Sequence, residues 1–499
     1  MGLNEPAAVD SVDCTGNACA TLRGAINSAA SGDTIVFAPA LDGQAIALFQ
    51  CSNAPSGTQF GPSAFFITGN RSLTIDARAG LARGITITVN PYGGLCTRLA
   101  PSSLSGTFRL FDIDPGASLT LRGLTLTNGA ARGGTSATGG SALGAGGAIF
   151  NQGTLVVEQG TFADNSAEGG SVREIVYVSA IGGAGVGGDA QSLNGGFPNA
   201  GAADGGFGGG GSFTVSPPGP HDGGFGGGGS AGNPIAGNGG FGAGGGGATS
   251  GGAGGFGGGN GGTFGGGAAG MGGAIFNDAG TVALRNVTFY ANRASGSAGV
   301  DPASGNGSGF GGAIFNYSGS VTIQYGTLVG NRVAAGSGGS GGSADGGAIY
   351  SLADGNCNLG GNVCAASTAS LELDNTIAAN NPGAANDVVL SVLNGAAVLD
   401  LGAGNLITHY EPAQFSAARV VSSADPQLVS LGVHGGPAMT LVPRAGSPAV
   451  DAVACNQPTL PADDERGTSR PQGAQCDIGA VERDAAIDTD WIFNDSFDY

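Results

Sequence analysis

The sequence contains no lysine, so its 17 basic residues are all arginines. This absence excludes a lysine Schiff base and a lysine general base. Histidine is also scarce, because the chain has only His221, His409 and His434, which lie far apart. No two cysteines have the Cys-x-x-Cys spacing either, and the sequence therefore predicts no metal site and no cofactor.

Positive charge is outweighed by 36 acidic residues, which gives a formal net charge of −19. Nucleic acids and anionic membrane surfaces are therefore poor partners. The sequence has no run of 18 or more apolar residues, so we expect no transmembrane segment.

Glycine is abundant, at 104 of 499 residues, and part of it belongs to a repeat. Gly-Gly-Ala-Ile-Phe-Asn occurs at 146–151, 272–277 and 311–316, and a weaker copy, Gly-Gly-Ala-Ile-Tyr-Ser, occurs at 346–351. Short runs rich in β-forming residues follow each copy, separated by Gly or Asn corners and without a helical period. A recurring unit of this kind usually stacks on its copies. We therefore predict an all-β solenoid, a parallel β-helix with three strands per rung.

Stacked rungs place equivalent residues in columns about 4.8 Å apart. The isoleucines of the repeat should form an interior column, and two sets of asparagines should form amide ladders at the corners, a structural role that we favour over a ligand site. The predicted ladder residues are Ile149, Ile275, Ile314 and Ile349, then Asn151, Asn277 and Asn316, and separately Asn165, Asn292 and Asn331.

The repeats, together with Thr21–Asn27, Gly32–Phe37 and Asn405–Ile407, resemble bacterial right-handed β-helix surface proteins of the polymorphic outer-membrane-protein type. The carboxyl segment resembles the choice-of-anchor Q domain, through motifs that include Gly446–Asp451 and Cys476–Glu482. These resemblances imply a right-handed β-helix in a secreted or surface-displayed bacterial protein, and no shared enzyme activity. Met1–Pro6 has neither the basic start nor the apolar core of a signal peptide, so we expect export with a signal peptide that is absent from this sequence.

The same reading divides the chain into segments. Residues 1–45 form an amino-terminal cap with a short amphipathic helix between Thr21 and Ser31, residues 46–424 form the β-helix, residues 425–482 form a carboxyl-terminal cap, and residues 483–499 form an acidic and aromatic tail. Four Gly-rich loops interrupt the β-helix at 129–145, 166–271, 294–310 and 333–345.

Each of these loops leads into a copy of the repeat, so all four should leave the rungs at the same corner and lie side by side on one flank. Glycine-rich composition usually indicates a flexible linker. Here both ends of the large insert are held close together, and its Gly-Gly-Phe units supply apolar groups that a solvated linker does not need. We therefore predict an ordered insert of extended three-residue helices that covers Phe150, Phe276, Phe315 and Tyr350.

The eight cysteines fall into four close pairs, which predicts four disulfides and an oxidising compartment, although eight cysteines allow many other pairings. The predicted pairs are Cys14 with Cys19, Cys51 with Cys96, Cys357 with Cys364, and Cys455 with Cys476.

Two sets of charged residues are candidates for a carbohydrate, calcium or catalytic site. Asp76, Asp112, Asp114 and Arg109 are the nearest approach to a carbohydrate groove, but we interpret them as corner caps or surface charges. In the carboxyl segment, Arg466 and Arg470 should pair with nearby carboxylates to hold irregular loops, rather than form a calcium or catalytic site. Those carboxylates are Asp463, Asp464, Glu465, Asp477 and Glu482. A structural calcium ion has no support from the sequence, and no catalytic residue is predicted.

The last residues resemble the Ile-Phe-x-Asp-Gly-Phe-Glu tails of many secreted proteins of proteobacteria, with Ser496 where glycine is usual. The tail either packs on its own cap or adds an edge strand to the next subunit of a head-to-tail filament. The residues assigned to such an assembly are Trp491, Ile492, Phe493, Phe497 and Tyr499.

These observations favour a noncatalytic extracellular structural or adhesive protein that contacts surfaces, glycans or other copies of itself and assembles into a filament or matrix. The alternative is a carbohydrate-active enzyme, a polysaccharide lyase or glycoside hydrolase, acting in a β-helix groove, which is an analogy from fold alone. The scarcity of histidine and the lack of a paired-carboxylate cluster disfavour the enzyme.

Overall fold

A computed structural model describes residues 3–4, 14–15, 18–52, 61–90, 108–172, 182–186, 188–190, 204–205, 207–215, 218–355, 358–359, 362–363, 368–455 and 460–484. In this part of the chain, regular structure is almost entirely β-strand. The single α-helix, α1 (Leu22–Ser28), lies in the predicted helical segment, and the Thr21 hydroxyl caps it by accepting a hydrogen bond from Gly24 N. The predicted all-β class with parallel sheets is confirmed.

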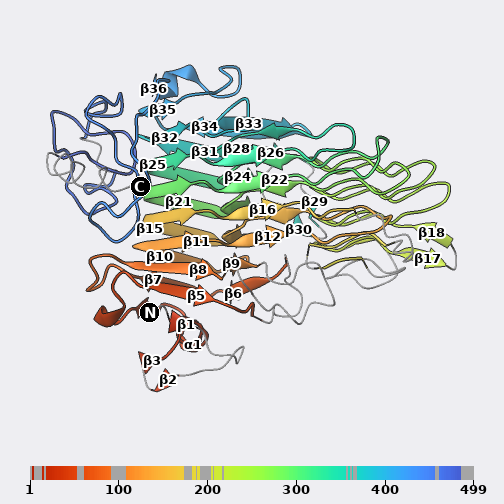
Figure 1. Ribbon diagram of the computed structural model, residues 1–499, viewed down its shortest axis with the longest axis horizontal. Coiled ribbons are helices and arrows are strands. Elements are labelled where there is room, and N and C mark those ends of the chain that lie inside the picture. Colours follow the sequence, from red (N-terminus) through yellow and green to blue (C-terminus); the bar gives the residue numbers. More distant parts are fainter. Residues whose placement is uncertain are drawn as a thin grey trace, which may run out of the picture.

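Three parallel ladders run from the first rung to the last, from the red strands at the bottom to the blue strands at the top of Figure 1. The first ladder contains β4 (Thr34–Val36), β7 (Ser72–Asp76), β10 (Ser118–Arg122), the first halves of β15 (Thr154–Ala163), β21 (Thr281–Tyr290) and β25 (Ser320–Val329), then β31 (Thr368–Asp374) and β34 (Ala397–Leu401). The second contains β1 (Leu3–Asn4), β5 (Ala45–Leu48), β8 (Ile85–Val89), β11 (Leu124–Thr127), the second halves of β15, β21 and β25, then β32 (Ile377–Ala379), β35 (Asn405–Ile407) and β36 (Val420–Ser422). The third contains β6 (Ser63–Ile67), β9 (Arg109–Ile113), β14 (Ile149–Asn151), β20 (Ile275–Asp278), β24 (Ile314–Tyr317), β28 (Ile349–Asp354) and β33 (Val388–Leu393).

The chain visits these ladders in a fixed order, from the third to the first to the second, and then begins the next rung. For example, β9 leads to β10 and β11, and β20 leads to β21, which serves the first and second ladders in turn. In β15, β21 and β25 the two halves meet at Gln159, Asn286 and Tyr325, each with a φ between 51° and 55°. These left-handed residues turn the strand through a corner without ending it.

The register within the third ladder places like residues side by side. Ile149 pairs with Ile275, Ile275 with Ile314, and Ile314 with Ile349. All four isoleucines are buried in the main core between the three ladders. Because side chains alternate along a strand, the phenylalanines that follow them point away from this core.

Two further parallel sheets project from one side of the rungs, and we call them the stem. One contains β12 (Ala130–Arg132), β16 (Ser166–Glu168), β22 (Arg293–Ser295) and β26 (Arg332–Ala334), and the other contains β13 (Gly144–Ala145), β19 (Gly270–Met271), β23 (Gly309–Phe310) and β27 (Ala344–Asp345). All four Gly-rich loops leave the rungs along the first of these sheets and return along the second. The loops therefore extend together on the right-hand side of Figure 1.

Shorter antiparallel pairs complete the strands. They are β2 (Cys14–Thr15) with β3 (Ala18–Cys19), β17 (Phe213–Val215) with β18 (Pro218–Pro220), and β29 (Asn358–Leu359) with β30 (Asn362–Val363). Two 3-10 turns, η1 (Pro39–Leu41) and η2 (Ala417–Arg419), lie near the first and last rungs.

The first end of the stack is closed by a helix, as the sequence predicts, whereas the last end is closed differently. At the first rung α1 buries Leu22 and Ile26 against the core, and β4, placed within the predicted cap, joins the first ladder. At the last rung Phe415 closes the core. The carboxyl segment does not cover that end. It runs along the side of the stack, where Ala480 N donates to Thr327 Oγ1 and the amide of Asn286 donates to Asp463 O. The polar corners of the rungs, not the open end, supply its partners.

Candidate functional site

The most unusual surface of the molecule is the glycine-rich flank, which we define as the described residues within 129–145, 166–271, 294–310 and 333–345. Its backbone hydrogen bonds recur at every third residue. Gly223, Gly226 and Gly229 donate to Asn238, Phe241 and Gly244 of the next run at 2.8, 3.0 and 3.1 Å. Gly239, Gly242 and Gly245 repeat the pattern toward Ala253, Phe256 and Gly259. A period of three is that of an extended polyproline-II-type helix, as predicted for the insert.

Each run folds back at a turn built from Phe and Gly. Gly227 N donates to Gly224 O at 2.8 Å, and the same bond joins Ala243 to Gly240 and Gly258 to Gly255. In these turns the third residue is Gly226, Gly242 or Gly257, with φ near +76°. Such a turn requires glycine at that position and leaves the preceding phenylalanine at the tip.

The runs pack so closely that side chains are excluded from their interior. A Cβ on Gly244 would lie 1.9 Å from Gly266 O, and one on Gly228 would lie 2.0 Å from Gly140 O. Ordering glycine is costly in conformational entropy. Dense backbone hydrogen bonding and close contact offset that cost here.

Phenylalanines at the turn tips form a stack that meets a second stack on the rungs. The ring centroids of Phe207, Phe225, Phe241 and Phe256 are separated by 5.0, 5.0 and 5.4 Å. On the outer face of the third ladder, Phe150, Phe276, Phe315 and Tyr350 are separated by 5.3, 5.2 and 5.4 Å. The two spacings agree because hydrogen-bonded backbones set both of them.

The stacks touch along their length, with 6.2 Å between the rings of Phe241 and Phe315 and also between those of Phe256 and Tyr350. Tyr317, two residues after Phe315 on β24, lies 4.4 Å from Phe241. Together with residues of the stem they form a second hydrophobic core, separate from the one inside the rungs. The flank is therefore fixed to the rungs by matched aromatic rows.

A column of acidic and amide side chains, missed in the sequence, ties the start of each run to the next. Asp204 Oδ1 accepts from Asp222 N at 3.1 Å, Asp222 Oδ1 accepts from Asn238 N at 2.6 Å, and Asn238 Oδ1 accepts from Ala253 N at 2.9 Å. Each of these three residues stands three positions before a stacked phenylalanine, in the pattern Asp/Asn-Gly-Gly-Phe. Aligning the phenylalanines would have revealed this repeat.

The predicted asparagine ladders lie where stacking requires. Asn151 donates to Asn277 at 2.7 Å and Asn277 to Asn316 at 2.8 Å, and the column continues to Ser351. Asn165 donates to Asn292 and Asn292 to Asn331, both at 2.9 Å, and Asn331 donates to Asn381, which the sequence reasoning missed. All six predicted asparagines are fully buried, so they brace the corners and offer nothing to a ligand.

Two of the predicted disulfides are present, joining Cys14 to Cys19 and Cys455 to Cys476. Cys51 is also disulfide-bonded. Cys96, Cys357 and Cys364 lie outside the described residues, as do the tail residues Trp491, Ile492, Phe493, Phe497 and Tyr499.

The acidic residues considered for a carbohydrate groove do not converge. Asp76 lies in the first ladder and pairs with Arg78 and Arg122, at 3.4 and 3.7 Å. Asp112 lies in the third ladder, buried with Arg109 at 3.7 Å, and burial raises its pKa to about 7. Burial likewise raises the pKa of Asp114 to about 6. A buried ion pair of this kind has no access to a substrate.

The charged residues of the carboxyl segment hold it against the rungs. Arg466 pairs with Asp464 at 2.8 Å and Arg470 with Glu482 at 2.9 Å, and all four side chains are almost completely buried. Glu465 accepts hydrogen bonds from the hydroxyls of Thr288 and Thr161, and burial raises its pKa well above the ordinary value. Burial also raises the pKa of Asp477 to about 6, and its Oδ1 accepts from Asp451 N. Asp463 takes part through its backbone oxygen, which accepts from Asn286.

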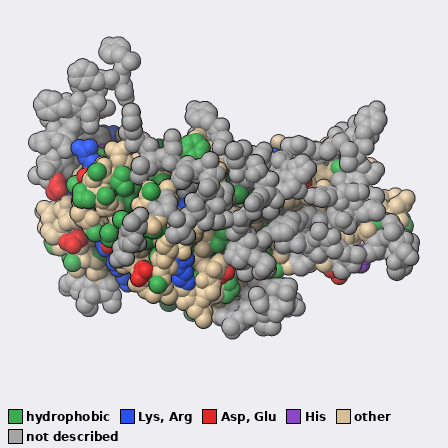
Figure 2. Space-filling view, turned by 90° about the horizontal axis from the view of Figure 1, so that it is seen from below, with side chains coloured by type: hydrophobic (Ala, Val, Ile, Leu, Met, Phe, Trp, Pro, Cys, Tyr) green, Lys and Arg blue, Asp and Glu red, His purple; other side chains and the backbone are tan. Residues whose placement is uncertain are grey.

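Neither set resembles a metal centre, since no group of three or more His, Cys, Asp or Glu side chains within the described ranges could hold an ion. Among the described side chains visible in Figure 2, acidic and basic ones are interspersed. None of the helices that the structure describes is long and apolar enough to cross a membrane. Comparisons with protein-family models, with curated proteins and with solved structures gave no match.

Proposed function

We propose that the chain is a right-handed parallel β-helix of the bacterial surface type, secreted or displayed at the cell surface, and that it acts as a noncatalytic structural and adhesive protein. In this proposal the rungs are a rigid support, and the glycine-rich flank is the surface that makes contact. The carboxyl segment is its choice-of-anchor Q-like part. Disulfides are compatible with the oxidising environment that such a location provides.

The observation that carries this proposal is the agreement in spacing between the two aromatic stacks. A flexible linker would not need aromatic residues at the same spacing as those of the rungs. A catalytic loop would not need a rigid layer of packed glycine runs. The flank instead extends as an ordered slab that is made mostly of glycine, with exposed Asp204, Asp222 and Asn238 along one column. Such a slab can lie flat against another surface, because few of its residues have long side chains.

Removing the slab while keeping the rungs tests the proposal. Residues 171–267 are replaced by a short Gly-Ser linker between β16 and β19. Because this exposes the aromatic row of the third ladder, the deletion is combined with Phe276→Thr and Phe315→Thr. We expect the far-ultraviolet circular dichroism of β-sheet to remain and retention on polysaccharide-coated or cell surfaces to be lost. Retention equal to that of the wild-type chain would show that the flank is not the adhesive surface.

Self-association is a second candidate, and the last rung favours it. In β34 the pairing with β31 places Leu399 and Leu401 beside Ser370 and Glu372, on the outer face of the first ladder. Leu399 is 51% and Leu401 is 41% exposed, and Val392 and Val421 are exposed nearby. Exposed apolar residues at an open strand edge are typical of an interface.

Sedimentation and electron microscopy at increasing concentration test this assembly. Assembly is supported if the wild-type chain forms rods and if these rods are shorter in the Leu399→Lys/Leu401→Lys variant. A wild-type chain that stays monomeric at all concentrations would contradict it.

The enzymatic alternative is tested on the same samples. New unsaturated or reducing ends after incubation with polygalacturonate or a neutral polysaccharide, with or without calcium, would replace the noncatalytic proposal.

A further inference from the structure

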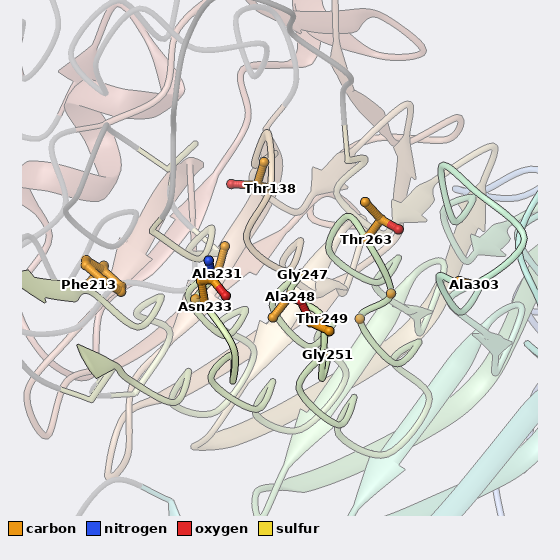
Figure 3. A pocket seen from close by; sticks show the side chains of 13 residues that line it. Thr138, Phe213, Ala231, Asn233, Gly247, Ala248, Thr249, Gly251, Thr263 and Ala303 are labelled. Carbon is orange, nitrogen blue, oxygen red and sulfur yellow. The ribbon is translucent and has the colours of Figure 1, made fainter. Parts of the chain in front are cut away.

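The far turns of the glycine-rich flank, opposite the phenylalanine tips, surround a hollow of about 920 Å³ (Figure 3). Its walls come from turns 231–233, 247–251 and 261–263 of the insert. The first loop adds Thr138, the third adds Ala303, and β17 adds Phe213. Loops that are far apart in the sequence therefore build one concave site of the size that small ligands occupy.

Three polar side chains in this hollow have hydrogen-bonding capacity to spare. Asn233, Thr249 and Thr263 are exposed, and none of them has a hydrogen bond to any residue that the structure describes. In Figure 3 their side chains, with that of Thr138, stand around the hollow from separate turns. The Phe213 ring, half-buried at one side, offers an apolar face.

The described residues of the lining carry no charge. Each of its residues is Gly, Ala, Thr, Asn or Phe, although the chain as a whole carries a net charge of −19. An anionic ligand would find no arginine here and would be repelled by the field of the protein. A cationic ligand would find no carboxylate. A neutral ligand with many hydroxyl groups and an apolar ring face matches both the amide and hydroxyl groups and the phenyl ring.

We propose that this hollow binds a neutral oligosaccharide, with Asn233, Thr249 and Thr263 as hydrogen-bonding partners and Phe213 as the stacking platform. The proposal rests on the adhesive function above and names its ligand class. Glycine on the walls has a direct role, because a sugar ring can approach the backbone without meeting a side chain.

The test uses the full chain and four probes: maltohexaose, cellohexaose, polygalacturonate and an extended hydrophobic peptide. We expect at least one neutral hexasaccharide to bind in isothermal titration calorimetry, and polygalacturonate and the peptide not to bind. The triple variant Asn233→Ala/Thr249→Ala/Thr263→Ala should weaken that binding by about a hundredfold, because three hydrogen bonds of about 1 kcal/mol each are lost. These residues are exposed, so thermal unfolding should not change.

The matched control is Thr120→Ala/Thr322→Ala, which removes two hydroxyls from the outer face of the first ladder and should leave the affinity unchanged. Equal affinity of the triple variant and the wild type would overturn the inference, as would preference for polygalacturonate or the peptide. If neither neutral hexasaccharide binds while the flank deletion still abolishes surface retention, the ligand class is wrong and the adhesive function stands. If the deletion leaves retention intact, the function itself fails.

Discussion

The rungs and the glycine-rich flank are two stacks with the same spacing between layers. Their interiors are filled differently, by side chains in the rungs and by backbone in the flank. In the rungs, columns of Ile, Leu and Phe fill the interior, and Ile149, Ile275 and Ile314 are completely buried. In the flank the backbones themselves fill the interior, since a Cβ at Gly244 has no room. The comparison shows that backbone hydrogen bonds set the spacing of both stacks. Side chains are needed only where the stacks meet, at the two aromatic rows.

The largest effect should come from breaking the junction. Phe276, in the aromatic stack of the third ladder (the inner row), is completely buried between the rungs and the flank. Phe241, in the stack at the turn tips (the outer row), is half-buried. Phe276→Ala should lower the free energy of unfolding by about 3–5 kcal/mol, because it leaves a cavity in both stacks. Phe241→Ala should cost distinctly less. Thermal unfolding of both variants measures the difference, and equal losses would mean that the flank does not bury the inner row in solution.

The next effect is a dependence on pH at the junction between the rungs and the flank. Asp278 is 1% exposed at the edge of the inner row, its Oδ2 accepts from Gln152, and its Oδ1 has no hydrogen bond. Tyr317 and Asp354 lie along the same edge, joined by a hydrogen bond of 2.9 Å. Burial raises the pKa of Asp278 to about 7.

A raised pKa means that the folded state holds the Asp278 proton more tightly than the unfolded state does. This proton therefore stabilises the folded state at low pH. Its contribution to the free energy of unfolding, a few kcal/mol, is lost as pH rises from about 4 to about 7. The protection factors of the flank amides, that is the ratios of the intrinsic to the observed hydrogen-exchange rate at each pH, should fall over this range. Asp278→Asn should remove that fall, while Asp222→Asn on the exposed column should keep it. An Asp278→Asn variant whose protection factors fall like those of the wild type would assign the effect to other carboxyls.

Close backbone contact in the flank predicts an intermediate effect. Gly244→Ala places a methyl group against Gly266 O and should cost about 1–3 kcal/mol, since neither backbone can move without breaking its own hydrogen bonds. Gly446→Ala is the matched control, because the nearest atom to its Cβ would lie 3.5 Å away. Protease resistance of the flank reports the result. Equal resistance of the two variants would show that the runs are loosely packed.

Sequence reasoning reached the rungs more fully than the flank, and the difference has a physical cause. In the rungs each column repeats a distinctive letter, such as the isoleucine of Gly-Gly-Ala-Ile, so the register could be counted. In the flank the interior is mostly glycine, with a few buried Ala and Ser residues, and the phenylalanines and the Asp/Asn column are the clearest marks of the register. The side position of the carboxyl segment could not be inferred either. Its partners Gln159, Asn286 and Thr327 come from three rungs that become neighbours only after stacking.

The smallest expected effects come from the amide columns, which contain Asn277 in the rungs and Asn238 in the flank. Asn277 is fully buried and bonded on both sides, so Asn277→Ala leaves polar groups without partners and should cost about 1–3 kcal/mol. Asn238 is exposed, and water can replace it as the acceptor for Ala253 N, so Asn238→Ala should cost at most about 1 kcal/mol. Asn238→Asp retains the acceptor and should unfold like the wild type. If Asn238→Ala instead cost as much as Asn277→Ala, the exposed column would be a main support of the flank, and backbone packing alone would not hold the glycine runs in register.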